Sequence, residues 1–184
     1  MTINYSNFFK GNKVRLTASR HEDAEIMVKW FEDAEYLRNV DTDIARPRMV
    51  TELESEEKSG PNSAYFRIRT LKDDELIGFV VIHNIEWNNR VGLLAIGIGE
   101  SKFRNLGYGQ DALQLILRYA FHELNLNRVG LDVIEYNQKA IHAYEKIGFQ
   151  KEGRMREAVF RDGNSYDRII MSILRSEWEA LNLH

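Results

Sequence analysis

The stretch FRNLGYGQDALQLILRYAF, residues 103–121, joins a glycine-rich turn to a long amphipathic helix. Apolar residues recur every three or four positions from Ala112 to Leu124, which predicts a helix over 107–124 with one buried face. Gly107 and Gly109 leave the first backbone N–H groups of that helix uncovered, at the positive end of its dipole. The turn therefore suits a phosphate or pyrophosphate group, although an ordinary strand-to-helix turn would have the same composition.

This turn fits neither of two common phosphate-binding signatures. It lacks the Gly-Lys-Ser/Thr ending of the phosphate loop and the third glycine of the dinucleotide fingerprint. Lys102 and Arg104 place positive charge beside it. Upstream, Gly97 and Gly99 interrupt the apolar strand predicted at 91–99, and such glycines mark a bulge or a close approach of the backbone.

The rest of the chain alternates strands and helices without a linker or a repeat. Ser19 is a candidate cap for a first helix, residues 32–62 read as helical pieces, and 137–148 reads as a helix that Gly148 ends. The predicted strands are 13–19, 63–71, 75–87, 91–99 and 128–135, followed by two more that close the chain. We therefore expect one α/β domain over residues 1–184.

Composition narrows the class of protein. Of the 184 residues, 43% are hydrophobic and 29% are charged, as in ordinary globular proteins. The chain has no cysteine, which excludes a thiolate nucleophile, a disulfide and a thiolate metal site. Neither a membrane span, a signal peptide nor a clustered basic stripe is evident, so we expect a cytoplasmic protein that binds no nucleic acid and no membrane. No histidine spacing suggests a metal site.

Charge is unevenly distributed along the chain. The net charge is −3, but residues 21–60 carry 12 acidic and 5 basic side chains. A basic remainder beside this acidic segment could suit an anionic cofactor and a cationic substrate, although solvated helix faces have the same appearance.

Two spaced motifs carry a resemblance to a known family. Arg104, Gly107 and Gly109 match its Q/R-x-x-G-x-G/A loop, and residues 137–149 follow N-x-x-A-x-x-x-Y-x-K-x-G-F. In this order they resemble the GNAT superfamily of acyl-CoA-dependent N-acetyltransferases, with core motifs over 91–149. The tail from 148 to 178 resembles the branch of spermidine acetyltransferases and ribosomal-protein N-terminal acetyltransferases.

The resemblance implies the acyl-CoA N-acyltransferase fold, an α/β (α+β) arrangement. Its central sheet is mostly antiparallel, helices cover both faces, and two strands diverge into a V-shaped opening. A bulge at Ile98–Gly99 would splay strand 91–99 from strand 128–135 and would aim a backbone N–H at the acetyl oxygen.

Acetyl-CoA is the implied cosubstrate, with no metal. The resemblance assigns its pyrophosphate to the loop and its pantetheine arm to Asn137 and Ala140. The full implied set of cofactor-binding residues is Ile98, Gly99, Arg104, Asn105, Leu106, Gly107, Tyr108, Gly109, Asn137, Ala140, Tyr144 and Lys146. Asn105 stands where many members have glycine, but asparagine tolerates left-handed backbone angles well enough to keep the turn.

Tyr144 is the implied catalytic acid. A phenol of pKa about 10 is neutral at pH 7 and can donate a proton to a leaving thiolate. Without the flanking motif, the same tyrosine would read as a core or rim aromatic. Glu86 is our first choice for a base, with His83, Glu100 or water as alternatives.

The acceptor is expected to be a primary amine. Trp30, Phe31, Tyr36 and neighbouring carboxylates from Glu32 to Asp43 lie in the segment that forms the acceptor side in the family. A polyamine such as spermidine, a protein or peptide N-terminus and other small amines all remain open. The expected reaction is direct transfer in a ternary complex; the alternatives are a non-catalytic CoA-binding regulatory module and a purely structural domain. A homodimer is possible.

Overall fold

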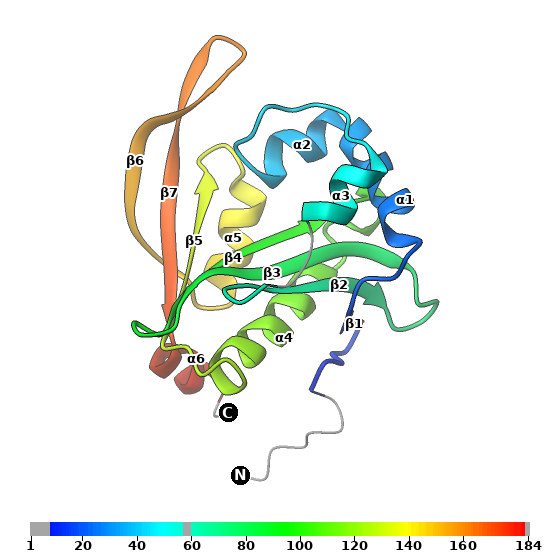
Figure 1. The fold of residues 1–184 in the computed structure, drawn as a ribbon. Helices are drawn as coiled ribbons and strands as arrows, with labels where there is room; N and C mark the ends of the chain where they lie inside the picture. The colour runs from blue at the N-terminus through cyan, green and yellow to red at the C-terminus, as the bar shows by residue number, and fades with distance from the viewer. Residues whose placement is uncertain (1–7, 57–59, 183–184) are drawn as a thin grey trace.

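The computed structural model describes residues 8–56 and 60–182. Figure 1 shows a central sheet flanked by helices, with the last two strands forming a long hairpin. The strands are β1 (Val14–Thr17), β2 (Ala64–Thr70), β3 (Leu76–Glu86), β4 (Val91–Ile98), β5 (Arg128–Ile134), β6 (Gln150–Arg161) and β7 (Asn164–Leu174). The helices are α1 (Asp23–Met27), η2 (Val28–Glu32), α2 (Ala34–Val40), α3 (Val50–Glu56), η3 (Ser101–Phe103), α4 (Tyr108–His122), α5 (Gln138–Lys146) and α6 (Arg175–Asn182).

The seven strands form one sheet in the order β1-β2-β3-β4-β5-β7-β6. Only β4 and β5 run parallel; the other five pairings are antiparallel. The mostly antiparallel sheet with helices on both faces confirms the expected fold class. Each predicted strand and long helix is present, usually one or two residues shorter than expected at each end.

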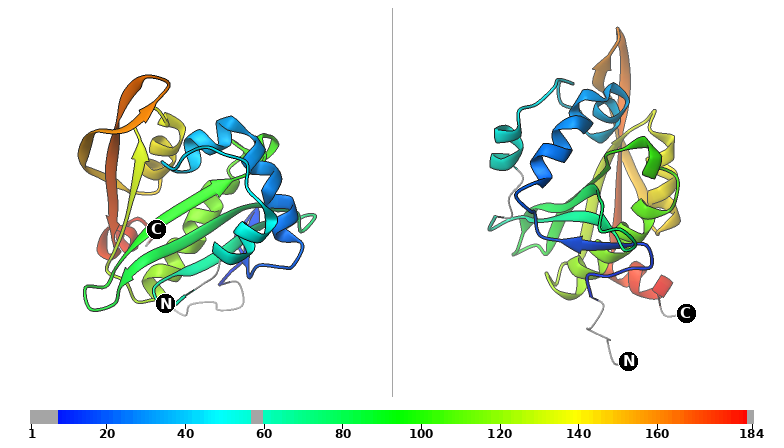
Figure 2. Two further views of the ribbon diagram at one scale, coloured as in Figure 1. Left: turned by 45° about the horizontal axis from the view of Figure 1, so that its top comes forward. Right: turned by 90° about the vertical axis from the view of Figure 1, so that its right-hand side faces the viewer.

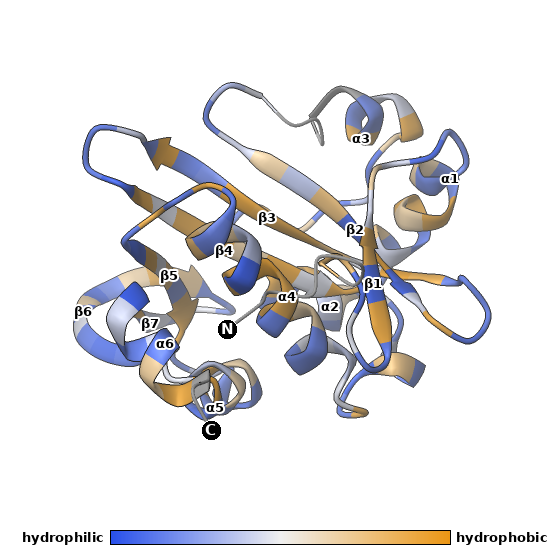
Figure 3. Ribbon diagram, turned by 90° about the horizontal axis from the view of Figure 1, so that it is seen from below, coloured by the Kyte–Doolittle hydropathy of each residue, from blue (hydrophilic) through white to orange (hydrophobic). Residues whose placement is uncertain are grey.

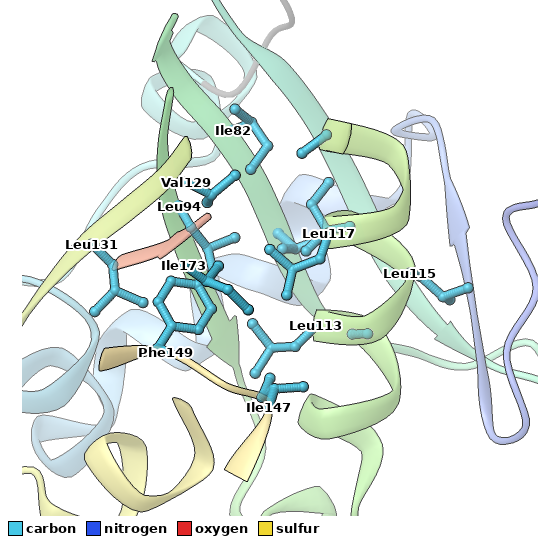
Figure 4. Packing of buried hydrophobic residues seen from close by; sticks show 14 of the residues in the cluster. Ile82, Leu94, Leu113, Leu115, Leu117, Val129, Leu131, Ile147, Phe149 and Ile173 are labelled. Carbon is cyan, nitrogen blue, oxygen red and sulfur yellow. The ribbon is translucent and has the colours of Figure 1, made fainter. Parts of the chain in front are cut away.

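The larger core lies between the sheet and α4. Leu113, Ile116 and Leu117 of this helix are at most 2% exposed, and Figure 4 shows Leu113 and Leu117 pointing at the sheet strands. The sheet residues labelled there are Ile82, Leu94, Val129, Leu131 and Ile173. Figure 3 shows the same separation along the chain, with hydrophobic residues on the central strands and α4 and hydrophilic residues at the turns. Burial of this apolar face, together with the helical spacing, explains why residues 108–122 form a helix here.

A second, smaller core covers the opposite face of β3 and β4. It consists of residues from α1, η2, α2 and α3 packed against Leu76 and Phe79. Trp30 and Tyr36 are buried in it, with their ring centroids 6.2 Å apart. The described part of 32–62, which leaves out 57–59, is helical in pieces, as predicted. Ser19 does not cap the first helix, because α1 begins after Glu22 with no side-chain cap.

The β6–β7 hairpin extends past the body of the sheet toward α2 (Figures 1 and 2). Its tip is bonded both to α2, through the ion pair of Arg38 with Asp162, and to the segment after α2, where Arg161 donates to the Asp43 carbonyl at 2.9 Å. The last described element is α6, where Trp178 packs on Phe121 of α4. No helix within the described residues is both long enough and apolar enough to cross a bilayer.

Candidate active site

The parallel strands β4 and β5 separate halfway along their length. They pair only from Val91↔Arg128 to Leu93↔Gly130, so 94–98 has no strand partner on the β5 side. Figure 1 shows the two strands diverging beyond that point. The predicted V-shaped opening therefore lies between β4 and β5.

The backbone of β4 presents polar groups to this opening. Gly99 N–H donates to the Ile77 carbonyl of β3 at 2.9 Å, and the register continues with Phe79↔Gly97. Because ladder residues alternate in direction, the N–H groups of Ile96 and Ile98 point away from β3 and into the opening. This edge of β4 can donate hydrogen bonds to a ligand that lies between β4 and β5, and can accept hydrogen bonds from it.

The predicted bulge at Ile98–Gly99 is wrong. The β3–β4 register is continuous through Gly97 and Ile98, and the irregularity lies instead at His83–Glu86 of β3. Both glycines allow aromatic side chains to lie close to the backbone. A Cβ on Gly99 would lie 2.0 Å from Cδ2 of Trp30, and one on Gly97 would lie 2.7 Å from Cε1 of Phe79 and 3.0 Å from the Tyr36 hydroxyl. Gly99 also uses its N–H within the sheet, so Ile98 is the residue whose amide faces the opening.

A cleft of about 890 Å³ occupies the opening and continues over the N-terminus of α4. Nine residues of the predicted cofactor set line it: Ile98, Arg104, Asn105, Gly107, Gly109, Asn137, Ala140, Tyr144 and Lys146. The remaining three do not. Gly99 faces Trp30, the Leu106 side chain is 52% exposed, and Tyr108 packs edge-on against Phe103.

The first turn of α4 is open to an anion. Gly107 is the N-cap, with φ of 84°, and no side chain caps the helix. Asn105 also has a positive φ, 62°, which confirms that asparagine can replace the usual glycine in this turn. Lys13 Nζ donates to the Leu106 carbonyl at 2.7 Å, and the first N–H groups of α4 have no partner within the helix. Asp111, the acidic residue of this turn, is bonded to the backbone N–H groups of residues 12–14.

The guanidinium of Arg104 does not lie free at the loop. Its Nε donates to the Ile98 carbonyl at 3.3 Å, and one NH2 group donates to the Gly99 carbonyl at 2.5 Å and to Asp33 at 3.1 Å. Asp33 caps α2 by accepting the N–H groups of Glu35 and Tyr36. Burial opposes its ionisation, but the Tyr36 amide, Arg104 and the Glu35 amide outweigh burial and lower the pKa of Asp33.

Tyr144 lies on α5 beside the opening, against Phe149 of the core, with ring centroids 5.7 Å apart. Burial, with a smaller contribution from the charge of Asp132, raises the pKa of Tyr144 to about 12. The phenol is therefore protonated at neutral pH and can act as a proton donor. Ala140, one turn earlier, lines the same cleft, and Asn137 caps α5 through the Ala140 amide.

Residues 13–150 match the family described as the Acetyltransferase (GNAT) domain. The chain belongs to this family of acetyltransferases. Its relatives include the SPbeta prophage-derived uncharacterized N-acetyltransferase YokL of Bacillus subtilis, 28% identical over 94% of this chain and 96% of the relative. The putative ribosomal N-acetyltransferase YdaF of the same organism is 34% identical over 60% of each chain.

Among solved structures, the spermidine N-acetyltransferase of Vibrio cholerae in complex with CoA and spermine is similar to this chain with a TM-score of 0.81. It is 25% identical, over 90% of this chain and 98% of that one. The family and these relatives confirm an acetyl-CoA-dependent N-acetyltransferase, in the branch that contains spermidine and ribosomal acetyltransferases.

Glu86, which the sequence predicts as the general base, does not line the cleft in the structure. Glu86 ends β3 and pairs in register with Val91, seven residues and about 23 Å from Ile98 along β4. Glu100 is bonded to Lys102, and His83, whose pKa is lowered by burial, lies opposite Leu93 before the strands diverge. Neither lines the cleft, and Lys102, which also pairs with Glu75, adds no charge there.

Other lining residues lie outside the predicted cofactor set. Glu35, Tyr36, Asn39 and Val40 lie on one face of α2, and Glu35 is the only carboxylate on the cleft among the described residues. Tyr36 and Glu35 had been placed on the acceptor side only in general terms. On α5, Lys139 joins Lys146; their spacing of seven residues, two helical turns, was a signal that both share one face.

Proposed function

We propose that this acetyltransferase moves the acetyl group of acetyl-CoA directly to a primary amine while both substrates are bound. The observation that carries the proposal is the cleft itself. One continuous space joins the uncapped N-terminus of α4, the free polar edge of β4, Tyr144, and the wall of α2 that carries Glu35. A single cavity of this kind lets an amine meet a thioester without a covalent enzyme intermediate, and the chain has no cysteine to form one.

The chain's residues fit acetyl-CoA along the whole cleft. The amides of the Gly107 turn would hold the pyrophosphate, since no side chain caps them, and Lys139 and Lys146 would add positive charge from α5. The pantetheine arm would lie along the free edge of β4, where it meets backbone donors and acceptors as a strand would. Ala140 leaves room for it because its side chain is a single methyl group.

Two groups would assist the transfer. The Ile98 N–H faces the opening and would donate to the acetyl oxygen, where negative charge develops during attack. The Tyr144 hydroxyl would protonate the departing thiolate, which the thioester supplies as its leaving group. No hydrogen bond to that hydroxyl is found among residues 8–56 and 60–182, so its proton is available to a ligand.

The amine would enter from the α2 side. Glu35 supplies a negative charge to attract an ammonium, and Tyr36 and Val40 supply an apolar wall. The similarity to the Vibrio cholerae enzyme, whose structure holds spermine, favours a polyamine as the first substrate to test. Peptide N-termini and other small amines remain alternatives, and the ammonium proton would leave through water.

The test is release of free thiol from acetyl-CoA with a panel of amines: spermidine, spermine, peptides with free N-termini and aminoglycosides. The protein adds no thiol background, because it has no cysteine. Amine-dependent release with intersecting initial-rate lines would support direct transfer, whereas parallel lines would contradict it. Binding of CoA without turnover of any amine would favour a non-catalytic CoA-binding module.

Replacing Tyr144 by Phe tests whether the Tyr144 hydroxyl acts as the general acid. We expect kcat to fall about 10²-fold or more, with the Kd for CoA unchanged within about twofold, because the hydroxyl acts in the transition state. Tyr119→Phe is the matched control, since Tyr119 lies on α4 in an aromatic cluster with Phe66 and does not line the cleft. An equal loss of CoA binding in Tyr144→Phe would show a packing role instead.

A further inference from the structure

Arg104 stands at the first position of the cofactor loop, yet its guanidinium bonds to the end of β4 and to α2. Its side chain is 21% exposed and lies over the Tyr36 ring, 5.8 Å from the centroid. Its donors are directed at Ile98, Gly99 and Asp33, with Glu35 3.7 Å away. These contacts point to a task other than holding a phosphate.

The first of these contacts fixes the peptide that follows the Ile98 amide. The Ile98 carbonyl is held by Arg104 at 3.3 Å, and the N–H of the same peptide unit, from Gly99, is held by the Ile77 carbonyl at 2.9 Å. Because a peptide unit is planar, holding both its ends fixes its orientation. The Ile98 N–H, one residue earlier, is thereby aimed into the opening.

The second effect is electrostatic. The carbonyls of Ile98 and Gly99 are consecutive dipoles at the end of β4, next to the place where the acetyl oxygen would become negative. Their oxygens would repel that charge if they were exposed to it. The guanidinium of Arg104 donates hydrogen bonds to both carbonyl oxygens, and its positive charge offsets their partial negative charge.

The third contact reaches the acceptor wall. Asp33 is the N-cap of α2, and the residues of α2 that line the cleft follow directly after it. Arg104 therefore links the strand that carries the proposed oxyanion donor to the helix that faces the amine. Residues 33 and 104 are far apart in sequence, and this contact joins the two elements that carry them.

We infer that Arg104 is a positioning residue: it aims the Ile98 amide and holds α2 in place, and its guanidinium does not bind the pyrophosphate. The inference rests on the proposed function, because the Ile98 amide matters only if the acetyl group is transferred there. It also separates Arg104 from the Gly107 turn, whose backbone amides form the anion site.

The test compares Arg104→Ala and Arg104→Lys with wild type, first confirming wild-type turnover. Misplacement of an oxyanion donor by about 1 Å costs on the order of 10²-fold, so we expect kcat to fall by about that factor in both variants. The Kd for CoA, measured by calorimetry, should change less than about threefold, since the anion site is made of backbone amides. Lysine cannot donate to three partners in this plane, so it should not rescue.

Two further readouts exclude a merely destabilised fold. Methylguanidinium should restore turnover severalfold in Arg104→Ala but not in Tyr144→Phe. Amide hydrogen exchange should show that the Gly99 N–H loses protection in Arg104→Ala while the β2–β3 pairing keeps it. Arg15→Ala is the matched control, because Arg15 lies on β1, does not line the cleft, and pairs through its guanidinium with Asp74.

A different set of results would show that Arg104 binds the pyrophosphate. If Arg104→Ala loses mainly CoA affinity, Arg104→Lys keeps both affinity and kcat, and methylguanidinium has no effect on kcat, the guanidinium binds phosphate and the inference is overturned. Absence of turnover in the wild type with every amine would instead contradict the proposed function. Asp33→Asn, which keeps the Ile98 and Gly99 contacts, should raise the KM for the amine more than it lowers kcat.

Discussion

Replacing Gly99 by Ala should destabilise the protein through a single clash. Gly99 does not have a positive φ, so alanine can adopt its backbone conformation without strain. The added Cβ would lie 2.0 Å from Cδ2 and 2.1 Å from Cε2 of Trp30. Carbon atoms in contact normally lie about 3.5 Å apart or more, so the ring must move by about 1.5 Å.

The ring has little room to move, because Trp30 is 3% exposed and packs against Tyr36. Overpacking of a well-packed core typically costs about 1–3 kcal/mol, and we expect the upper part of this range. Gly109→Ala is the matched control: its Cβ would meet only Ile98 Cγ1 at 3.8 Å, in the first turn of α4. There alanine should be neutral or should stabilise the helix by up to about 1 kcal/mol.

The assay is urea unfolding followed by tryptophan fluorescence and by circular dichroism. In a Trp30→Phe background the smaller ring should reduce the cost of Gly99→Ala, which a double-mutant cycle would measure as coupling. An unfolding free energy within about 0.5 kcal/mol of wild type, with unchanged fluorescence, would refute the steric explanation of Gly99.

Further predictions concern the cofactor loop and titration. Lys13→Met should raise the Kd for CoA by about tenfold at unchanged kcat, because the Leu106 carbonyl loses its hydrogen-bond partner. A charge-assisted hydrogen bond contributes about 1.5 kcal/mol, which corresponds to this factor. Calorimetry measures the Kd, and an unchanged value would contradict the prediction. The pKa of Asp33 is lowered by folding, so its ionised form stabilises the protein above the unfolded pKa near 3.9 and ceases to do so as pH falls through the lower folded value. The stability difference between wild type and Asp33→Asn should accordingly shrink below about pH 4 in urea titrations, and a difference that grew there would contradict it. Because burial raises the pKa of Tyr144 to about 12, kcat should show no loss from phenol ionisation up to about pH 10; a decline centred near pH 8 that Tyr144→Phe abolishes would contradict this.

Local patterns in the sequence were sufficient for the architecture. The spacing of apolar residues around 107–124 predicted α4, and alternation predicted β2, β3 and β4 to within two residues. Periodicity works here because one face of each element is buried and the other is solvated. The loop and the 137–149 motif were informative for the same reason: each lies within one strand-turn-helix unit whose geometry is local.

Predictions that needed two distant segments were less successful. Glu86 was near the glycine strand in sequence, but strand direction places it at the wrong end of β4. The glycines at 97 and 99 are unusual in an apolar strand, but their reason lies in side chains of other elements: Phe79 and Tyr36 at Gly97, and Trp30 at Gly99. Nothing in the local pattern indicates which aromatic ring will rest on which backbone.

The amino-acid sequence was therefore sufficient to predict the elements, their order, the family and the loop that lines the cleft. The packing of sheet and helices was needed to show that Ile98 and not Gly99 directs its amide into the cleft, that Arg104 reaches Asp33, and that Glu35 lines the cleft. The physical reason is that helix and strand periods depend on neighbours a few residues apart. The partners of a guanidinium or an amide are set instead by how sheet and helices pack, which no short stretch of sequence contains.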